Sequence, residues 1–197
     1  MQTKAIIKAA LNVSKEGYVP KPALMIPLIG DENEFNYLKE IIDKTAKELI
    51  GDEALEYEIG SMLEVPRSIV IADKLAKESK FFSFGTNDLT QMTYGFSRDD
   101  AGRFLTDYYE KGIFKTDPFK TIDKDGVGKL VAVGTKLARG ENPDIEIGIC
   151  GEHGGDPESI KLCHEVGLDY VSCSPYRVPI AILAAAQAAI KSRGQSK

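Results

Sequence analysis

The stretch IEIGICGEHGGDPESIKLCHEVGLDYVSCSPY (145–176) decides the fold class of this chain. Its first part, IEIGIC (145–150), and its last, DYVSCSPY (169–176), have the short apolar runs typical of buried strands. Between them, PESIKLCHEVG (157–167) has apolar residues at helical spacing and closes on a glycine. A strand, a helix and a second strand in this order predict two parallel strands joined by a right-handed crossover. The stretch therefore predicts an α/β protein.

The same alternation of strands and helices continues through the rest of the chain. The other expected strands are PALMIPLIG (22–30), IGSMLEVP (59–66) and FFSFGTNDL (81–89). The other expected helices are an amphipathic one at residues 1–17, one after the capping-box pair Asp31 and Glu34, one starting at Pro66 with inner face Ile69, Ala72 and Ala76, one at 127–139 and an alanine-rich one at 179–192. Such repeated units predict a parallel sheet covered by helices.

One segment, residues 90–125, does not fit this alternation. It is rich in Asp, Gly, Phe and Tyr and has no clear strand or helix pattern. Irregular connections of this length in compact domains are usually functional. We therefore expect a long functional connection between the third strand and the helix at 127–139.

Five strand-helix units leave two architectures open. A closed eight-stranded barrel usually needs about 250 residues, and this chain has 197 and begins with a helical pattern. The residues alone are compatible with a five-stranded open sheet and with most of a barrel that lacks its first strands. No repeat, low-complexity tract or linker divides the sequence, so residues 1–197 are expected to form one domain.

The composition excludes several classes of protein. The chain is 43% hydrophobic and 28% charged, which suits a globular domain, and its formal net charge of -5 predicts no binding to nucleic acid or to an anionic membrane. The first residues lack the apolar block and cleavage site of a signal peptide. Three cysteines are too few for a disulfide scaffold. We expect a cytoplasmic protein.

Acidic side chains follow two of the expected strands. Glu64 ends one strand, and Asp88 follows the turn that ends the next. Because the carboxyl ends of parallel strands share one edge, the two carboxylates are expected to meet there and to bind Mg²⁺. The alternatives are structural: Glu64 can favour a helix start, and Asp88 can cap a helix.

Cys150 lies among glycines at the end of another strand. A thiol with an ordinary pKa near 8.5 is mostly protonated at neutral pH, which suits a proton donor, whereas a nearby positive charge would favour a nucleophilic thiolate. Cys163 and Cys173 are interpreted as core residues. The spacing of the cysteines and histidines fits no common zinc site, and DKDGVG (123–128) lacks the closing glutamate of a calcium loop.

Three stretches together resemble the C-terminal domain of the pyruvate, phosphate dikinase family of PEP-utilising enzymes. They are GSMLEVPR, FFSFGTNDLTQMTYGFSRDDAGRFL and GICGEHGGDPESIKLCHEVGLDYVSCSPYRVPIA, and the resemblance extends from about Met25 to Ala188. It implies a (β/α)8 barrel of the TIM type that binds phosphoenolpyruvate or pyruvate with Mg²⁺. The five units would correspond to strands four to eight, so the barrel is expected to be incomplete.

The resemblance also implies roles for particular residues. The implied metal ligands are Glu64 and Asp88, the implied substrate-binding residues are Glu64, Gly85, Thr86, Asn87 and Asp88, and the implied catalytic residues are Cys150, His153, Tyr170 and Ser172. Cys150 would protonate the enolate carbon of enolpyruvate, and the other three would support that transfer as a relay. One departure is Ile182, which stands where the family usually has arginine.

The implied function is that of a part of a phosphotransferase. The full enzyme converts ATP, phosphate and pyruvate to AMP, diphosphate and phosphoenolpyruvate, and the present chain is expected not to perform this overall reaction alone. The implied partners are a second copy, forming a homodimer, and the phosphohistidine domain of the full-length enzyme. Two alternatives stay open: a metal-dependent lyase or aldolase acting on a pyruvate enolate, and a non-catalytic dimerisation fragment.

Overall fold

The computed structural model describes residues 1–195 and contains a five-stranded sheet in the order β1-β2-β3-β4-β5. The strands are β1 (Ala23–Ile26), β2 (Glu58–Leu63), β3 (Phe81–Gly85), β4 (Glu146–Cys150) and β5 (Tyr170–Val171). Every neighbouring pair is parallel. Because all five strands run in the same direction, their carboxyl ends lie along one edge. The predicted α/β class and parallel sheet are confirmed.

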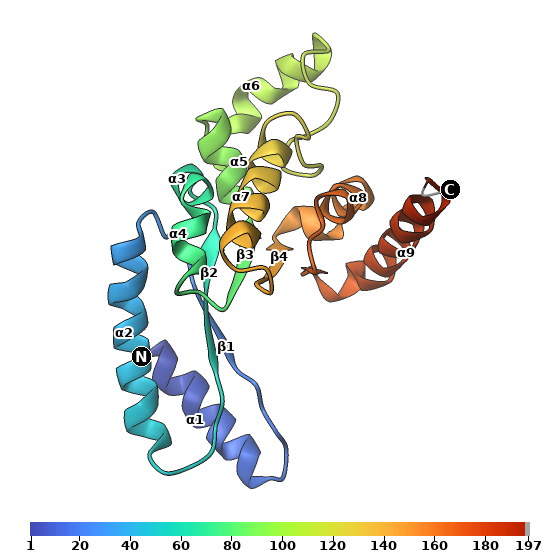
Figure 1. Cartoon of the computed structure of the whole chain (residues 1–197). Coiled ribbons are helices and arrows are strands. Elements are labelled where there is room, and N and C mark those ends of the chain that lie inside the picture. The colour runs from blue at the N-terminus through green and yellow to red at the C-terminus, as the bar shows by residue number, and fades with distance from the viewer. Residues whose placement is uncertain (196–197) are drawn as a thin grey trace.

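Helices connect the strands and cover the sheet. They are α1 (Gln2–Lys15), α2 (Glu32–Ile50), α3 (Pro66–Val70), α4 (Ala72–Ala76), α5 (Thr86–Tyr94), α6 (Arg98–Glu110), α7 (Val127–Glu141), α8 (Pro157–Val166) and α9 (Val178–Gln195), with short 3-10 helices η1 (Glu152–Gly155) and η2 (Pro175–Arg177). In Figure 1, α1 and α2 lie with β1 and β2 at one end, and α8 and α9 lie at the other. The helix α6 lies beyond the carboxyl ends of the strands (Figure 1).

The centre of the core is the strand β3, whose five residues are all buried. Phe82 and Phe84 have no exposed surface and belong to the largest apolar cluster of the described residues. The helix α7 packs closely over this strand at Gly134, where a Cβ would lie 3.2 Å from the Phe84 ring. Burial of such aromatic side chains contributes strongly to stability. The core therefore holds β3, and the residues that follow it, in a fixed position.

The segment 90–125 differs from the expectation because much of it is helical. The end of α5 and all of α6 lie within it, and Ser97 caps α6 by accepting a hydrogen bond from the Asp99 amide at 3.2 Å. Aromatic contacts hold α6 and the following residues to α5; the rings involved are Tyr94, Phe96, Phe104, Tyr108, Phe114 and Phe119. Residues 95–97 join the two helices, and residues 111–126 form the long irregular connection. The high content of charged and glycine residues concealed this helix.

Several expected elements are shorter in the structure. The strands predicted at 22–30, 59–66 and 81–89 span Ala23–Ile26, Glu58–Leu63 and Phe81–Gly85, and residues 86–89 belong to α5 instead. The helix after Pro66 is interrupted at Ile71, although Ile69, Ala72 and Ala76 are buried as predicted. The last strand has two residues, since only Tyr170 and Val171 pair with β4. The chain leaves the sheet there because Ser174 and Pro175 begin η2.

The predicted starts of α2 and α8 are confirmed, but Glu34 has a different hydrogen-bond partner from the one expected. Asp31 caps α2 by accepting from the Asn33 amide at 2.9 Å, and Asp156 caps α8 by accepting from the Ser159 amide at 2.9 Å. Glu34 accepts from the amide of Gly30 at 2.9 Å, one residue before the partner that a capping box requires. Within residues 1–195, no helix has the length and apolar character needed to cross a bilayer.

Candidate active site at the carboxyl edge of the sheet

Three chemically reactive side chains meet at the carboxyl ends of β2, β3 and β4. Glu64 directly follows β2, Asp88 lies in the first turn of α5 after β3, and Cys150 is the last residue of β4. The strands β3 and β4 pair to their last residues, where Gly85 is the register partner of Cys150. The two carboxyl groups and the thiol are separated in the sequence but share one edge of the sheet.

The carboxyl group of Glu64 is buried, and only 3% of the residue is exposed. Burial raises its pKa, the 2.7 Å hydrogen bond from the Leu28 amide opposes this shift, and the neighbouring carboxyl of Asp88 raises the pKa further. The carboxyl group fits because residue 85 is glycine: a Cβ there would lie 2.3 Å from Oε2 of Glu64. Gly85 therefore makes room for the Glu64 carboxyl.

Asp88 and Asn87 are presented by the start of α5. Oδ1 of Asp88 accepts a hydrogen bond from the side-chain amide of Gln91 at 2.9 Å. Oδ1 of Asn87 is buried and has no hydrogen-bond partner within the described chain, and a Cβ on Gly151 would lie 3.2 Å from it. A buried acceptor without a partner costs free energy, which a bound donor or cation would recover.

The donors at this edge fit a hard divalent cation. Asp88 lies close enough to Glu64 to disfavour the ionised form of the Glu64 carboxyl, and a cation between them would remove that cost. No cluster of three or more His, Cys, Asp or Glu side chains suited to a metal occurs in residues 1–195. Two carboxylates without further protein ligands suit Mg²⁺, which keeps several waters or substrate oxygens as ligands.

Cys150 is half-buried, and its thiol lies 3.5 Å from the carbonyl oxygen of Phe84. Burial raises the pKa of this thiol, the Ser83 hydroxyl lowers it, and the negative charge of Glu64 raises it. The net direction is upward, so the protonated form is favoured at neutral pH. This environment agrees with a proton donor better than with a nucleophilic thiolate.

Ser83 and Tyr170 lie beside this thiol. The Tyr170 hydroxyl donates to the Phe82 carbonyl at 3.2 Å, and burial raises its pKa while Ser83 lowers it. The Ser83 oxygen is buried, makes no hydrogen bond of ordinary geometry to residues 1–195, and influences both Cys150 and Tyr170. Gly148 admits the Tyr170 ring, because a Cβ there would lie 2.2 Å from ring carbons.

Ser83 is the residue of this group that sequence reasoning missed. It is the one polar side chain in the strand FFSFG, whose residues are all buried. A hydroxyl in the middle of a wholly apolar strand is costly unless it has a partner or a role. That pattern is visible in the sequence and would have identified it.

His153 and Thr86 are fully buried next to one another. The Nδ1 atom of His153 lies 2.7 Å from the Thr86 hydroxyl, and its Nε2 atom lies 2.8 Å from the Pro118 carbonyl oxygen. Burial lowers the pKa of His153, which favours the neutral ring. The structure thus places His153 in the predicted site region with both ring nitrogens occupied.

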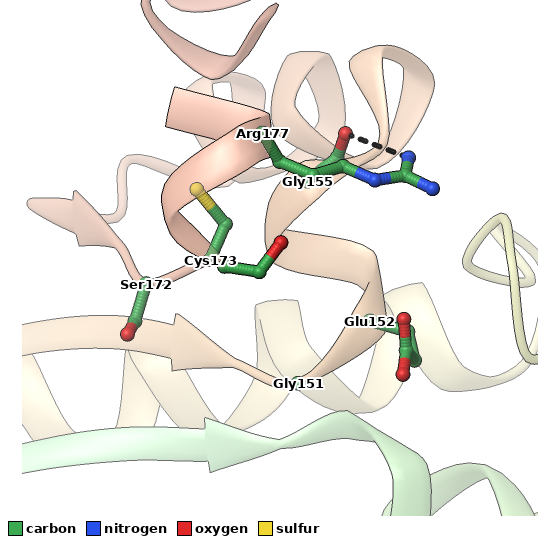
Figure 2. Close-up of a pocket in the computed structure, with 7 residues that line it drawn as sticks. Gly151, Glu152, Gly155, Ser172, Cys173 and Arg177 are labelled. Atoms are coloured by element: carbon green, nitrogen blue, oxygen red, sulfur yellow. Dashed lines mark hydrogen bonds between the residues drawn. The ribbon is translucent and has the colours of Figure 1, made fainter. Parts of the chain in front are cut away.

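Ser172 lies at the side of the site, in the wall of a cavity of about 240 Å³ beyond the ends of β4 and β5 (Figure 2). The cavity is lined by Gly151, Glu152, Gly155, Ser172, Cys173, Ser174 and Arg177. The side chains of Ser172 and Cys173 point in opposite directions, and the Arg177 guanidinium donates to the Gly155 carbonyl at 3.4 Å (Figure 2). Gly154 lets the chains approach, since a Cβ there would lie 2.1 Å from the Ser172 carbonyl oxygen. Cys163 is core as predicted, whereas Cys173 is partly exposed.

Comparison with known proteins identifies the family. The family model described as "PEP-utilising enzyme, PEP-binding domain" matches residues 1–190. The chain belongs to this family. Membership agrees with the edge just described, where a carboxylate pair, an unpartnered amide oxygen and a protonated thiol converge.

Individual relatives of this PEP-binding domain are named pyruvate, phosphate dikinase. The protein of Clostridium symbiosum is 52% identical over 196 residues, which is 98% of this chain and 22% of the relative. Pyruvate, phosphate dikinase 1, chloroplastic, of Arabidopsis thaliana is 50% identical over 192 residues, which is 96% of this chain and 20% of the relative. The protein of Giardia intestinalis is 50% identical over 195 residues, which is 98% of this chain and 22% of the relative. The chain thus spans about a fifth of the length of the curated relatives it matches.

A solved structure, the crystal structure of citrate synthase SbnG, superposes with a TM-score of 0.46 at 14% identity over 96% of this chain and 70% of that one. This score is too low to establish a common architecture.

Proposed function

We propose that this PEP-binding domain chain is the part of a pyruvate, phosphate dikinase that binds phosphoenolpyruvate or pyruvate and carries out the proton transfer between them. The observation that carries the proposal is the meeting of Glu64, Asp88 and Cys150 at one edge, where Asp88 acts on the Glu64 carboxyl and the Glu64 charge acts on the Cys150 thiol. The relatives at about half identity support the assignment to a phosphotransferase.

In this proposal Glu64 and Asp88 hold Mg²⁺. When bound, the ion would stabilise negative charge on the enolate oxygen of the substrate as a Lewis acid. The side-chain amide of Asn87 and the turn from Gly85, at the end of β3, to Asp88 would line the substrate site. The Oδ1 atom of Asn87, which is buried and has no hydrogen-bond partner among the described residues, supports this role, because a bound donor or cation would satisfy it.

Cys150 is proposed as the acid. Its thiol proton would pass to the methylene carbon of enolpyruvate, forming the methyl group of pyruvate, and the thiolate would take the proton back in the reverse direction. The raised pKa of the thiol keeps that proton in place at neutral pH. Tyr170, through Ser83, would return a proton to the thiolate, because Ser83 acts on both groups. The relay roles of His153 and Ser172 stay predictions.

The larger assembly also belongs to the proposal. Five parallel strands in sequential order support a (β/α)8 barrel in which they correspond to strands four to eight. A phosphohistidine domain would deliver or accept the phosphoryl group at the enol oxygen. A homodimer and a cytoplasmic location are likewise proposed, whereas the relatives of Arabidopsis thaliana and Mesembryanthemum crystallinum are named chloroplastic.

The test follows the methyl protons of pyruvate. With the purified chain and Mg²⁺ in deuterated water, we expect pyruvate to acquire deuterium, as measured by NMR, and we expect C150A to abolish the exchange. Omission of Mg²⁺ should have the same effect. Exchange that persists in C150A would exclude Cys150 as the acid, and release of pyruvate from 2-oxo-4-hydroxy acids would favour the lyase alternative.

A further inference from the structure

The ring of His153 joins three segments that are distant in the sequence. His153 lies in η1, just after Cys150, and has no exposed surface. Its Nδ1 atom contacts the hydroxyl of Thr86, the first residue of α5, at 2.7 Å. Its Nε2 atom contacts the carbonyl of Pro118, in the irregular connection 111–126, at 2.8 Å. One buried side chain therefore links η1, the substrate turn and the long connection.

The hydrogen-bond partners of the His153 ring determine which of its nitrogens carries the hydrogen. A carbonyl oxygen can only accept, so the 2.8 Å contact with Pro118 requires the hydrogen to be on Nε2. In a neutral ring Nδ1 then presents a lone pair, and the Thr86 hydroxyl must donate to it. That hydroxyl also lies 3.3 Å from the Cys150 carbonyl oxygen, but it has one hydrogen, and the 2.7 Å contact takes it.

This arrangement fixes the position of the substrate turn. The hydroxyl of Thr86 cannot rotate without breaking its bond to the ring, and η1 cannot move away from α5 without breaking the same bond. Asn87 and Asp88 follow Thr86 directly, and Gly151 alone separates Cys150 from η1. The ring thus controls how the acid faces the groups proposed to bind substrate and metal.

We infer that His153 is a positioning residue, whose neutral ring, with hydrogen on Nε2, holds the Thr86 hydroxyl and thereby keeps the turn 85–88 aligned with the Cys150 thiol. The inference rests on the proposed function for its effect on rate, but the proton arrangement itself does not depend on it. It differs from the relay role predicted for His153, because a ring with both nitrogens occupied by Thr86 and Pro118 has no nitrogen left for the thiol.

The proton arrangement can be tested without any activity. The chain has two histidines, so ¹⁵N NMR of the imidazole rings gives two sets of signals, with exposed His164 as an internal reference. We expect His153 to have its hydrogen on Nε2. T86V should shift the Nδ1 signal of His153 alone. T90V is the matched control, because the Thr90 hydroxyl is also buried but has no partner within the described chain. A hydrogen on Nδ1, or equal shifts in both variants, would overturn the inference.

The positioning role is tested by two amide variants in the pyruvate exchange assay. H153N can keep an acceptor near the Nδ1 position, and H153Q can keep a donor near the Nε2 position. We expect H153Q to lower the rate about tenfold, the effect of one lost buried hydrogen bond, and H153N to lower it less. T86V should remove the difference between them. The pH profile of H153N should match that of the unmodified chain.

The alternative outcomes are distinct. Equal and complete loss in both amide variants, with a changed pH profile in any residual rate, would support the relay role and overturn positioning. Thermal unfolding separates these effects from misfolding. If the unmodified chain shows no exchange, the proposed function fails, whereas the NMR experiment still decides whether His153 holds Thr86.

Discussion

The carboxyl ends of β3 and β4 differ from the outer face of α9 in how closely the chain is packed. At β3 and β4, glycines admit the Glu64 carboxyl and the Tyr170 ring at distances that no Cβ would allow. On α9, large apolar side chains are exposed; they include Ile180, Ile182, Leu183 and Ile190. Two small residues of that helix, Ala181 and Ala184, pack with Ile160 of α8 and are buried. The comparison predicts that substitutions at the central edge have larger effects than substitutions on the exposed face of α9.

The largest effect should come from C150A. If the thiol is the acid, its removal should lower the pyruvate exchange rate by about 10² to 10⁴. Cys173→Ser is the matched control, since that thiol is partly exposed and lies in the neighbouring cavity. NMR measures both rates. A similar loss in the two variants would remove the distinction between the central edge and its surroundings.

A large effect is also expected for metal binding. At a Mg²⁺ concentration of about 100 times its dissociation constant, binding should raise the free energy of unfolding by about 2.7 kcal/mol. D88N should abolish this increase, whereas Asp99→Asn, in the exposed first turn of α6, should keep it. Thermal unfolding with and without Mg²⁺ measures the difference. An undiminished increase in D88N would place the ion elsewhere.

Adding one methyl group at the central edge should destabilise the protein. In G85A the new Cβ would lie 2.3 Å from Oε2 of Glu64, so the expected cost is about 1 to 3 kcal/mol. In G102A, within α6, the Cβ meets nothing within 4 Å, and stability should rise by up to about 1 kcal/mol. Denaturant unfolding measures both. Equal effects would mean that the central edge is less tightly packed than its contacts indicate.

Acid should destabilise the centre through His153. Burial lowers its pKa in the folded state, whereas the unfolded side chain titrates near 6.5, so the unfolded state binds more protons below that pH. This contribution is complete above about pH 6.5 and is lost as the pH falls toward the folded-state pKa, by at most about 1.4 kcal/mol per pH unit. The free energy of unfolding should therefore depend less on pH in H153N than in H164N. Denaturant unfolding between about pH 5 and 8, the range in which histidine titrates, measures this dependence.

The smallest effect should come from α9. Ile182→Arg places the usual family residue on an exposed position, and the free energy of unfolding should change by less than about 0.5 kcal/mol. Sedimentation measures the mass of both proteins in parallel. A loss of unfolding free energy above about 1 kcal/mol, which is twice the usual effect of a surface substitution, or a smaller mass would show that another chain covers this face in solution.

Much of the fold was predictable because local patterns and tertiary packing agree. The apolar runs at 22–30, 81–89 and 145–150 predicted strands that the structure contains, although the second of these ends at Gly85 and its last four residues begin α5. The helix α6 was not predictable in the same way, because aromatic contacts over several residues, rather than its own pattern, hold it in place. The shortening of β5 likewise depends on how the chain turns into η2.

The candidate site was predictable where it follows strand ends. Parallel strands place Glu64, Asp88 and Cys150 at one edge whatever the side chains around them. Ser83 could have been identified as the one polar residue of an apolar strand, but its neighbours Cys150 and Tyr170 are known only from the structure. The contact of His153 with Pro118 joins residues 35 positions apart, and no periodic pattern reports such a distance.

The pairing of Gly85 with Cys150 at the last rung of the β3–β4 ladder limits how the two strands can vary. Since successive side chains of a strand point to opposite faces, one inserted or deleted residue in β4 would rotate the thiol to the other side of the sheet. Substitutions in β4 leave each side chain on the same face of the sheet, but insertions and deletions do not. Insertions and grafted segments should therefore be accommodated in the helices and connections, while the residue count of these two strands must be kept.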